Sequence, residues 1–387
     1  MRIARRIEHV PPYLFAEIDR KKAEVQARGV EVISLGIGDP DQPTPEHIVK
    51  TLQAEAAVPA HHRYPAYEGS PEYRRAVATY YKKRFGVDLD PEREVTALIG
   101  SKEGIGHIFL AFVDPGDYTL IPDPGYPVYR TGTIFAGGIP HLMPLRAENG
   151  FFPDLGAVDP EAARKARLMF LNYPNNPTGA VAGPAQLQKA VDFCRERGIV
   201  LCHDAAYLEF TYDGYRQPSL LEIDGSMEVG LEFGSLSKPY NMTGWRIAYA
   251  VGNADAVSAL RIIKTNLDSG QFTAIERAAV AALEGSQEPV EGMRNLYKER
   301  RDLVIDALRK VGLQVDPPAG SFYVWAPVPP GRTSTEFATR LLEETGVLVV
   351  PGVGYGEAGE GYFRISLTID TSRLREAMAR VVERFKV

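Results

Sequence analysis

Short apolar runs alternate with amphipathic stretches from about residue 45 to about residue 275. Six runs have the length of strands, at 95–99, 119–121, 168–171, 199–202, 229–233 and 247–251. Residues 199–202 are apolar at every position, as expected for a strand that is buried on both faces. The segments between the runs, such as 184–197 and 255–265, carry apolar residues at helical spacing. The pattern predicts an α/β fold in which a mostly parallel sheet lies between helices.

The regions on either side have a different character. Residues 11–29 begin with two prolines, carry apolar side chains at helical spacing and stop at a glycine, which is typical of a helix. Residues 35–45 contain too much glycine and proline for a helix or a strand, so their backbone is either exposed or approaches another group closely. A long helical pattern at 289–311 leads into further strand candidates, which lie at 321–325, 347–350 and 362–367.

These patterns predict three parts. Residues 1–45 form an N-terminal segment that packs with a small domain, residues 46–288 form a large domain, and residues 289–387 form the small α+β domain.

Composition excludes several classes of protein. The chain of 387 residues is 44% hydrophobic, which is enough for a large buried core. Its formal charge of −6 comes from interspersed acids and bases without a basic stripe, which argues against a nucleic-acid partner. We expect no membrane span and no metal, because no apolar run reaches 18 residues and Cys194, Cys202 and His61–His62 lack ligand spacing. A reduced cytoplasmic protein that binds small molecules is the prediction.

Polar residues that can take part in binding or catalysis directly follow several predicted strands. They stand in the segments 100–104, 123–127, 172–179 and 203–207. Because parallel strands end at the same edge of a sheet, we expect these segments to converge there. Each has a plain alternative when taken singly, namely a turn, a helix cap or, at His203, a hydrogen-bonded core histidine. Their convergence favours a binding site.

The segment 235–246 carries the most specific chemistry. Ser235, Ser237 and Lys238 follow a predicted strand, and Arg246 comes eight residues after the lysine. A phosphorylated carbonyl cofactor needs an amine that forms a Schiff base, and hydroxyl and guanidinium donors for its phosphate. A solvated turn with an ordinary lysine explains the segment alone equally well. Ser-x-x-Lys enzymes that react with penicillin are excluded because the companion motifs are missing, and the Gly-x-Gly-x-x-Gly match at 354–359 lacks the context of a dinucleotide site.

Taken together, these motifs resemble the class I pyridoxal-phosphate aminotransferases of fold type I over nearly the whole chain. Asn176-Pro-Thr-Gly179, Asp204 with Tyr207, and Ser235-x-Ser-Lys238 with Arg246 occur in that family's order and spacing. The segments 11–19, 62–69, 100–104 and 241–245 are most similar to the branch of the family that acts on LL-diaminopimelate. The resemblance implies a fold type I transferase whose large domain binds pyridoxal 5′-phosphate, and a homodimer with shared active sites.

The resemblance implies a role for each matching residue. Lys238 would form the Schiff base and move the substrate proton, while Asp204 would face the pyridine nitrogen. The other cofactor contacts would be Tyr207 and Asn176 at the phenolic oxygen, Tyr126 on the ring, and Ser101, Lys102, Ser235, Ser237 and Arg246 at the phosphate. Tyr64 would reach the phosphate in the partner subunit. The substrate would contact Tyr13, Gly38, Lys102, Tyr126, Asn176 and Arg364. The guanidinium of Arg364 would bind the α-carboxylate in two parallel bonds, and Asp123–Pro124 and Asn176–Pro177 would be cis.

The implied reaction moves an amino group from an L-amino acid to a 2-oxo acid. The first hypothesis takes LL-2,6-diaminopimelate as donor and 2-oxoglutarate as acceptor, a step towards lysine. Lys102, Glu103 and Tyr13 would meet the distal charges of the donor, although Lys102 and Glu103 can equally be surface and cap residues. A broader alanine, aspartate or aromatic aminotransferase and a pyridoxal-phosphate-dependent carbon–sulfur lyase remain alternatives. A non-enzymatic regulator would need a DNA-binding domain, for which about 45 residues leave no room.

Overall fold

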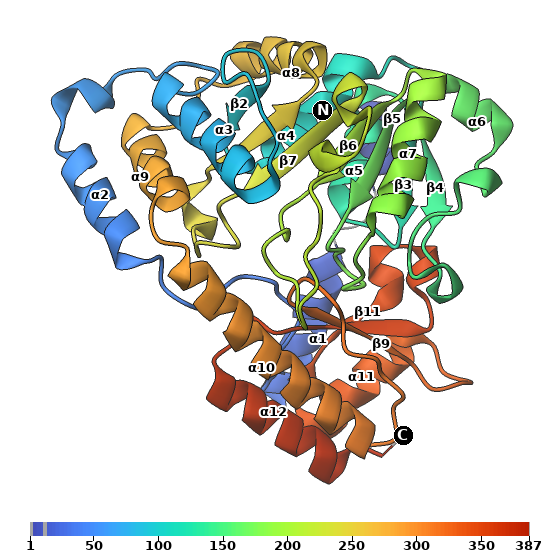
Figure 1. Cartoon of the computed structure of the whole chain (residues 1–387). Helices are drawn as coiled ribbons and strands as arrows, with labels where there is room; N and C mark the ends of the chain where they lie inside the picture. Colours follow the sequence, from blue (N-terminus) through green and yellow to red (C-terminus); the bar gives the residue numbers. More distant parts are fainter. Residues whose placement is uncertain (1–2, 11–13, 387) are drawn as a thin grey trace.

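A seven-stranded sheet forms the centre of the larger part of the molecule (Figure 1). The structure is a computed structural model that describes residues 3–10 and 14–386, with the backbone alone for residues 14–19. The strand order is β2 (Val95–Leu98), β8 (Ala248–Gly252), β7 (Gly230–Ser235), β6 (Val200–Asp204), β5 (Ala166–Asn172), β3 (Tyr118–Asp123) and β4 (Ile139–Pro144). Only β8 runs antiparallel to its neighbours. The predicted mostly parallel sheet is confirmed.

Helices cover both faces of this sheet (Figure 1). They are α3 (Pro71–Phe85), α4 (Ser101–Phe112), α5 (Pro127–Ala136), α6 (Pro160–Lys165), α7 (Pro184–Arg197), α8 (Ala254–Leu267) and α9 (Thr273–Glu284), and α2 (Glu46–Ala56) packs against α9. Along β5, Leu168 and Phe170 pack in the cluster that α4, α5 and α8 supply. Met169 and Leu171 pack in the cluster that α6 and α7 supply. This alternation explains why the central strands read as continuous apolar runs.

Four adjacent strands end in polar residues at one edge of the sheet. The last residues of β3, β5, β6 and β7 are Asp123, Asn172, Asp204 and Ser235. These strands are parallel neighbours, so their carboxyl ends lie together. The edge therefore gathers polar groups above an apolar core.

A second group of elements lies below that edge in Figure 1. It contains α10 (Glu288–Lys310), α11 (Ser334–Thr345), α12 (Thr371–Arg384) and an antiparallel sheet of β11 (Val350–Pro351), β12 (Tyr362–Ser366) and β9 (Tyr323–Pro327). The N-terminal helix α1 (Leu14–Ala27) contacts α11, and β1 (Ile33–Ser34) pairs in parallel with β10 (Val347–Leu348). The domain limits at residues 45 and 288 stay predictions. Among the described helices, none is both long and apolar enough to cross a membrane.

Two local features differ from the sequence prediction. Strand β4 was not predicted, because it contains Pro140 and Pro144 and lies half exposed at the sheet edge, where proline is tolerated. The cis bonds at Asp123–Pro124 and Asn176–Pro177 are confirmed, and Tyr173–Pro174 is a further cis bond that was not predicted.

Candidate active site

Asp204 lies at the end of β6 with one carboxylate oxygen paired and one free. Its Oδ2 accepts a hydrogen bond from the Tyr129 hydroxyl at 2.8 Å. Its Oδ1 is buried and has no hydrogen-bond partner among the described residues. Burial raises the pKa of Asp204, although the Tyr129 hydroxyl, His203 and Lys238 oppose this effect. A cationic donor placed at Oδ1 would therefore stabilise the carboxylate form.

Lys238 follows β7 and is nearly buried. Its Nζ donates a hydrogen bond to the carbonyl of Gly38 at 3.0 Å and lies 5.6 Å from the centre of the Phe322 ring. Burial is the main cause that lowers the pKa of this amine to about 8, Asp39 opposes the shift, and the cation Arg246 adds to it. An amine with this pKa has a usable unprotonated fraction near neutral pH, which suits a nucleophile or a general base.

Arg364 brings a buried cation to the same place from β12. Its side chain is 2% exposed, and it donates to Asn176 Oδ1 at 2.7 Å and to the Gly36 carbonyl at 2.6 Å. Its Nε has no hydrogen-bond partner, and no acid in the described part of the chain pairs with it. Buried charges are ordinarily paired, so this arrangement suits the binding of an anion.

Asparagines connect the arginine to the aspartate. The side chain of Asn172 donates to the Asp204 carbonyl at 2.7 Å and accepts from the Asn176 N–H at 2.8 Å. Since Asn176 in turn accepts from Arg364, one chain of hydrogen bonds runs from β6 to β12.

Two tyrosines, Tyr207 and Tyr323, belong to the same buried group of side chains. The Tyr207 hydroxyl lies 3.3 Å from the Tyr323 hydroxyl. Burial, together with Tyr323 and Asp204, raises the pKa of Tyr207, so its hydroxyl stays protonated and can donate. The Tyr323 ring packs against Arg364, with its centre 4.0 Å from the guanidinium carbon. Tyr207 thus belongs to the same buried group as the arginine.

Arg246 lies against the loop that precedes α4. A Cβ on Gly100 would overlap the guanidinium of Arg246, so only glycine allows this close approach. Ser101, the next residue, begins α4, where backbone N–H groups are free to bind an anion. Ser235 and Ser237 are buried, and Ser235 Oγ accepts from the Ser237 N–H at 3.1 Å. These groups match the chemistry of a phosphate site.

Tyr126 stands at the start of α5 beside two members of the group. Its ring contacts Tyr129 edge to face, with centroids 5.9 Å apart, and the Nζ of Lys102 lies 5.9 Å from its centre. Through these contacts, Tyr126 and Lys102 link Tyr129, the hydrogen-bond partner of Asp204, to the start of α4.

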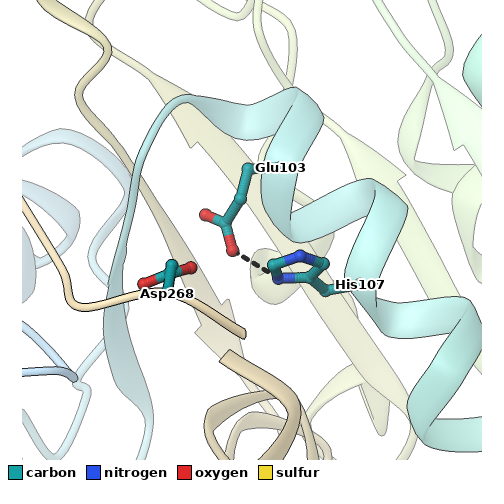
Figure 2. A group of neighbouring side chains, drawn as sticks. All are labelled: Glu103, His107 and Asp268. Atoms are coloured by element: carbon teal, nitrogen blue, oxygen red, sulfur yellow. Dashed lines mark ion pairs between the residues drawn. The ribbon is translucent and has the colours of Figure 1, made fainter. Parts of the chain in front are cut away.

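Glu103 has the contacts of a helix cap, which is the alternative that the sequence left open beside a place at the distal end of the donor. Its Oε2 accepts from the Ile99 N–H at 2.9 Å, and its Oε1 lies 2.6 Å from His107 Nδ1. Figure 2 shows Glu103 and His107 on one helix facing Asp268 from another segment. Lys264 pairs with Asp268 at 2.8 Å and lies 3.7 Å from Glu103, so the carboxylate is already engaged.

Of the other predicted residues that the structure describes, Tyr64 and His203 do not take part in the buried group. Tyr64 is 86% exposed in the single chain. Tyr13 lies outside the described residues. His203 is the core histidine that the apolar strand predicted, since its Nδ1 pairs with Glu232 at 2.7 Å and its Nε2 accepts from the Tyr173 N–H at 3.3 Å.

Sequence reasoning missed Tyr129, Tyr323 and the carbonyl of Gly36. Tyr129 carries a readable signal, because it stands one helical turn after Tyr126. Tyr323 and Gly36 carry none, since their position depends on how distant segments pack.

The sheet order and the buried lysine beyond its carboxyl edge define a fold type I transferase. The chain belongs to the class I and II aminotransferase family, whose model matches residues 30–381. It is 59% identical to an LL-diaminopimelate aminotransferase of Desulforudis audaxviator, over 98% of this chain and 96% of that one. It is 57% identical to the LL-diaminopimelate aminotransferase of Moorella thermoacetica, over 98% of both chains. A substrate-bound structure of BacF from Bacillus subtilis is 39% identical, with a TM-score of 0.93 over 99% of this chain and 98% of that one.

Proposed function

We propose that this aminotransferase uses pyridoxal 5′-phosphate to move an amino group from LL-2,6-diaminopimelate to 2-oxoglutarate. The observation that carries the reaction class is the buried Arg364, which has no acid partner among the described residues. It donates to the Gly36 carbonyl, and Lys238 donates to the Gly38 carbonyl two residues further on. The two relatives named above as LL-diaminopimelate aminotransferases support the choice of donor, because they match over nearly the whole chain.

The donor groups present fit pyridoxal 5′-phosphate. Asp204 offers a buried, unpartnered Oδ1 for the protonated pyridine nitrogen. Asn176 and Tyr207 would donate hydrogen bonds to the phenolic oxygen, and Tyr126 would cover the ring. Donors for the phosphate come from Ser101, Lys102, Ser235, Ser237 and Arg246. When bound, this cofactor supplies an aldehyde that takes up amino groups and a conjugated ring that accepts the electron pair of a substrate Cα.

The residues of the chain would divide the work. Lys238 would hold the aldehyde and, once released from it, carry the proton to and from the substrate Cα, for which its lowered pKa is suited. Asp204 would keep the pyridine nitrogen protonated. Arg364 would bind the α-carboxylate of the amino donor and afterwards that of the 2-oxo acid, because both substrates carry this group in the same place.

Selection of LL-diaminopimelate must come from groups near its distal ammonium and carboxylate. Lys102 stands beside Tyr126 and forms no ion pair with an acid in the described part of the chain, so its ammonium would be available to the distal carboxylate. We also propose that the active form is a homodimer in which Tyr64 reaches the phosphate in the partner subunit. Its exposed ring in the single chain supports this proposal, since such a side chain gains a contact only from outside the chain.

Steady-state kinetics test the donor. With 2-oxoglutarate as acceptor, kcat/KM for LL-diaminopimelate should exceed that for alanine, aspartate and phenylalanine by about a hundredfold or more, because unpaired distal groups cost several kcal/mol in a closed site. A higher value for one of the other donors would reject the substrate and leave the family unchanged. Oxo-acid and ammonia release without any acceptor would instead support a lyase.

A further inference from the structure

Residues 36–41 form a backbone strap that touches both cations of the site. The Gly36 carbonyl accepts from Arg364 Nη2 at 2.6 Å, and the Gly38 carbonyl accepts from Lys238 Nζ at 3.0 Å. A Cβ on Gly38 would overlap the hydroxyl of Tyr323, so the strap lies as close to the site as a glycine backbone can. A shift of the strap would therefore move the partners of both cations.

The strap has no helix or strand of its own, so its place depends on side-chain contacts. Thr368 holds the middle, because its hydroxyl donates to the Ile37 carbonyl at 2.9 Å and accepts from the Asp39 N–H at 3.1 Å. Asp41 holds the far end through an ion pair with Arg300 of α10.

Arg300 is 1% exposed, and all three of its guanidinium nitrogens donate hydrogen bonds. Nη1 and Nη2 donate to the two carboxylate oxygens of Asp41 at 2.7 and 2.8 Å, a bidentate pair. Nη1 also donates to the Leu367 carbonyl at 3.0 Å, and Nε donates to the Thr371 hydroxyl at 3.0 Å. Leu367 directly follows β12, the strand that carries Arg364. One side chain thus fixes the strap relative to the strand of the substrate arginine.

We propose that Arg300, acting through Asp41, is a positioning residue that orients Arg364 for substrate carboxylates. The strap and Asn176 each occupy one N–H of Arg364, which directs its remaining donors, Nε among them, towards an incoming carboxylate. The inference rests on the proposed role of Arg364 as the carboxylate ligand.

The next residue on the same helix is a matched control. Arg301 is 3% exposed and also donates several hydrogen bonds, to Asp213 Oδ2 at 2.7 Å, Asp302 Oδ1 at 2.8 Å and the Pro318 carbonyl at 3.1 Å. None of these partners belongs to the strap. Replacing the guanidinium of Arg301 should lower the stability of the protein as replacing that of Arg300 does, but it should not move Gly36.

The experiment compares Arg300→Lys, Asp41→Asn and Arg301→Lys as holoenzymes. Lysine keeps the charge of Arg300 and loses the bidentate geometry, while asparagine keeps the shape of Asp41 and loses its charge. We expect KM for the amino donor and for the 2-oxo acid to rise together by about tenfold in the first two variants, with kcat changed by less than about threefold. The visible absorption of the bound cofactor should stay unchanged. Arg301→Lys should keep both KM values within about twofold of the original.

Two outcomes would overturn the proposal: unchanged KM values in Arg300→Lys and Asp41→Asn, or an equal rise in Arg301→Lys. If Arg300→Lys does not fold, Asp41→Asn decides alone. The double variant adds a second measurement, since residues that act as one pair should give a KM close to that of either single variant. Arg364→Lys distinguishes a failure of the proposed role of Arg364 from a failure of the positioning role of Arg300. If it leaves KM unchanged, the proposed role of Arg364 fails, whereas a rise there without one at Arg300 rejects only the positioning role.

Discussion

Lys238, Asp204 and Arg364 are buried ionic groups without ion-pair partners among the described residues. A buried charge without a partner costs several kcal/mol, so a chain that served stability alone would pair or remove each of them. In the proposed function, Asp204 would bind a pyridinium and Arg364 a carboxylate, while the unprotonated amine of Lys238 would react with an aldehyde. Binding of cofactor and substrate would then offset the cost of burying these groups.

The lowered pKa of Lys238 predicts how cofactor uptake depends on pH. Burial is the main cause that lowers this pKa from 10.5 to about 8, and only the unprotonated amine attacks an aldehyde. When the cofactor-free chain is mixed with pyridoxal 5′-phosphate, the rate at which visible absorbance develops should rise with pH up to about 8 and then level off. A rate that keeps rising towards pH 10.5 would contradict the burial argument. Lys238→Ala serves as the control and should develop no such absorbance.

At the scale of elements, Glu232 of β7 joins four neighbours behind the site. It accepts from His203 on β6 at 2.7 Å, from the Tyr81 hydroxyl on α3 at 2.7 Å, and from Ser219 Oγ and the Leu220 N–H at 2.7 Å each. Burial raises the pKa of Glu232, but the hydrogen bonds from His203, Tyr81 and Ser219 outweigh this effect and lower it overall. His203 lies next to Asp204, so this cluster supports the end of β6.

We expect Glu232→Gln to lower the free energy of unfolding by about 1–3 kcal/mol, because the amide offers one oxygen in place of two and leaves buried donors without an acceptor. Urea unfolding at pH 7 measures the loss. The carboxylate of Glu228 is exposed and pairs with Arg195, so Glu228→Gln is the control and should cost less than about 1 kcal/mol. Since the folded pKa of Glu232 is lowered, its contribution is present above pH 4.5 and disappears as the pH falls through the folded value. Equal losses in the two variants would refute this account.

Periodicity predicted the elements that are buried and continuous, and missed those that depend on packing. The runs at 168–171, 199–202 and 229–233 gave β5, β6 and β7 because strands covered on both faces are apolar throughout. Edge strand β4 carries two prolines and breaks that pattern, and the reversed direction of β8 leaves no mark on an apolar run.

The site divides in the same way. Lys238 and Asp204 were predicted because they stand in motifs that follow predicted strands, and Arg364 because its motif resembles that of the family. The bond from Tyr129 to Asp204 and the pair of Arg300 with Asp41 instead join segments far apart in sequence. For Glu103 the sequence left two interpretations open, and its bond with the Ile99 N–H favours the helix cap.

At the scale of the whole molecule, one chain brings together a site from the strap, four parallel strand ends and β12, yet leaves Tyr64 exposed. If Tyr64 completes the phosphate site of a second chain, each active site needs two subunits. The oligomer should then be a dimer or a multiple of it, which sedimentation measures directly.

Mixed dimers test whether the sites are shared. A Lys238→Ala subunit lacks the amine but has an intact Tyr64, and a Tyr64→Ala subunit has the amine but lacks the tyrosine. In a hybrid of the two, one site has lost both groups and the other has lost neither. When equal amounts of the two nearly inactive variants are unfolded and refolded together, half of the dimers are hybrids, so activity should return to about a quarter of the original value. Each variant refolded alone is the control. If Tyr64 acts only within its own chain, no hybrid has an intact site and the mixture stays as inactive as its components.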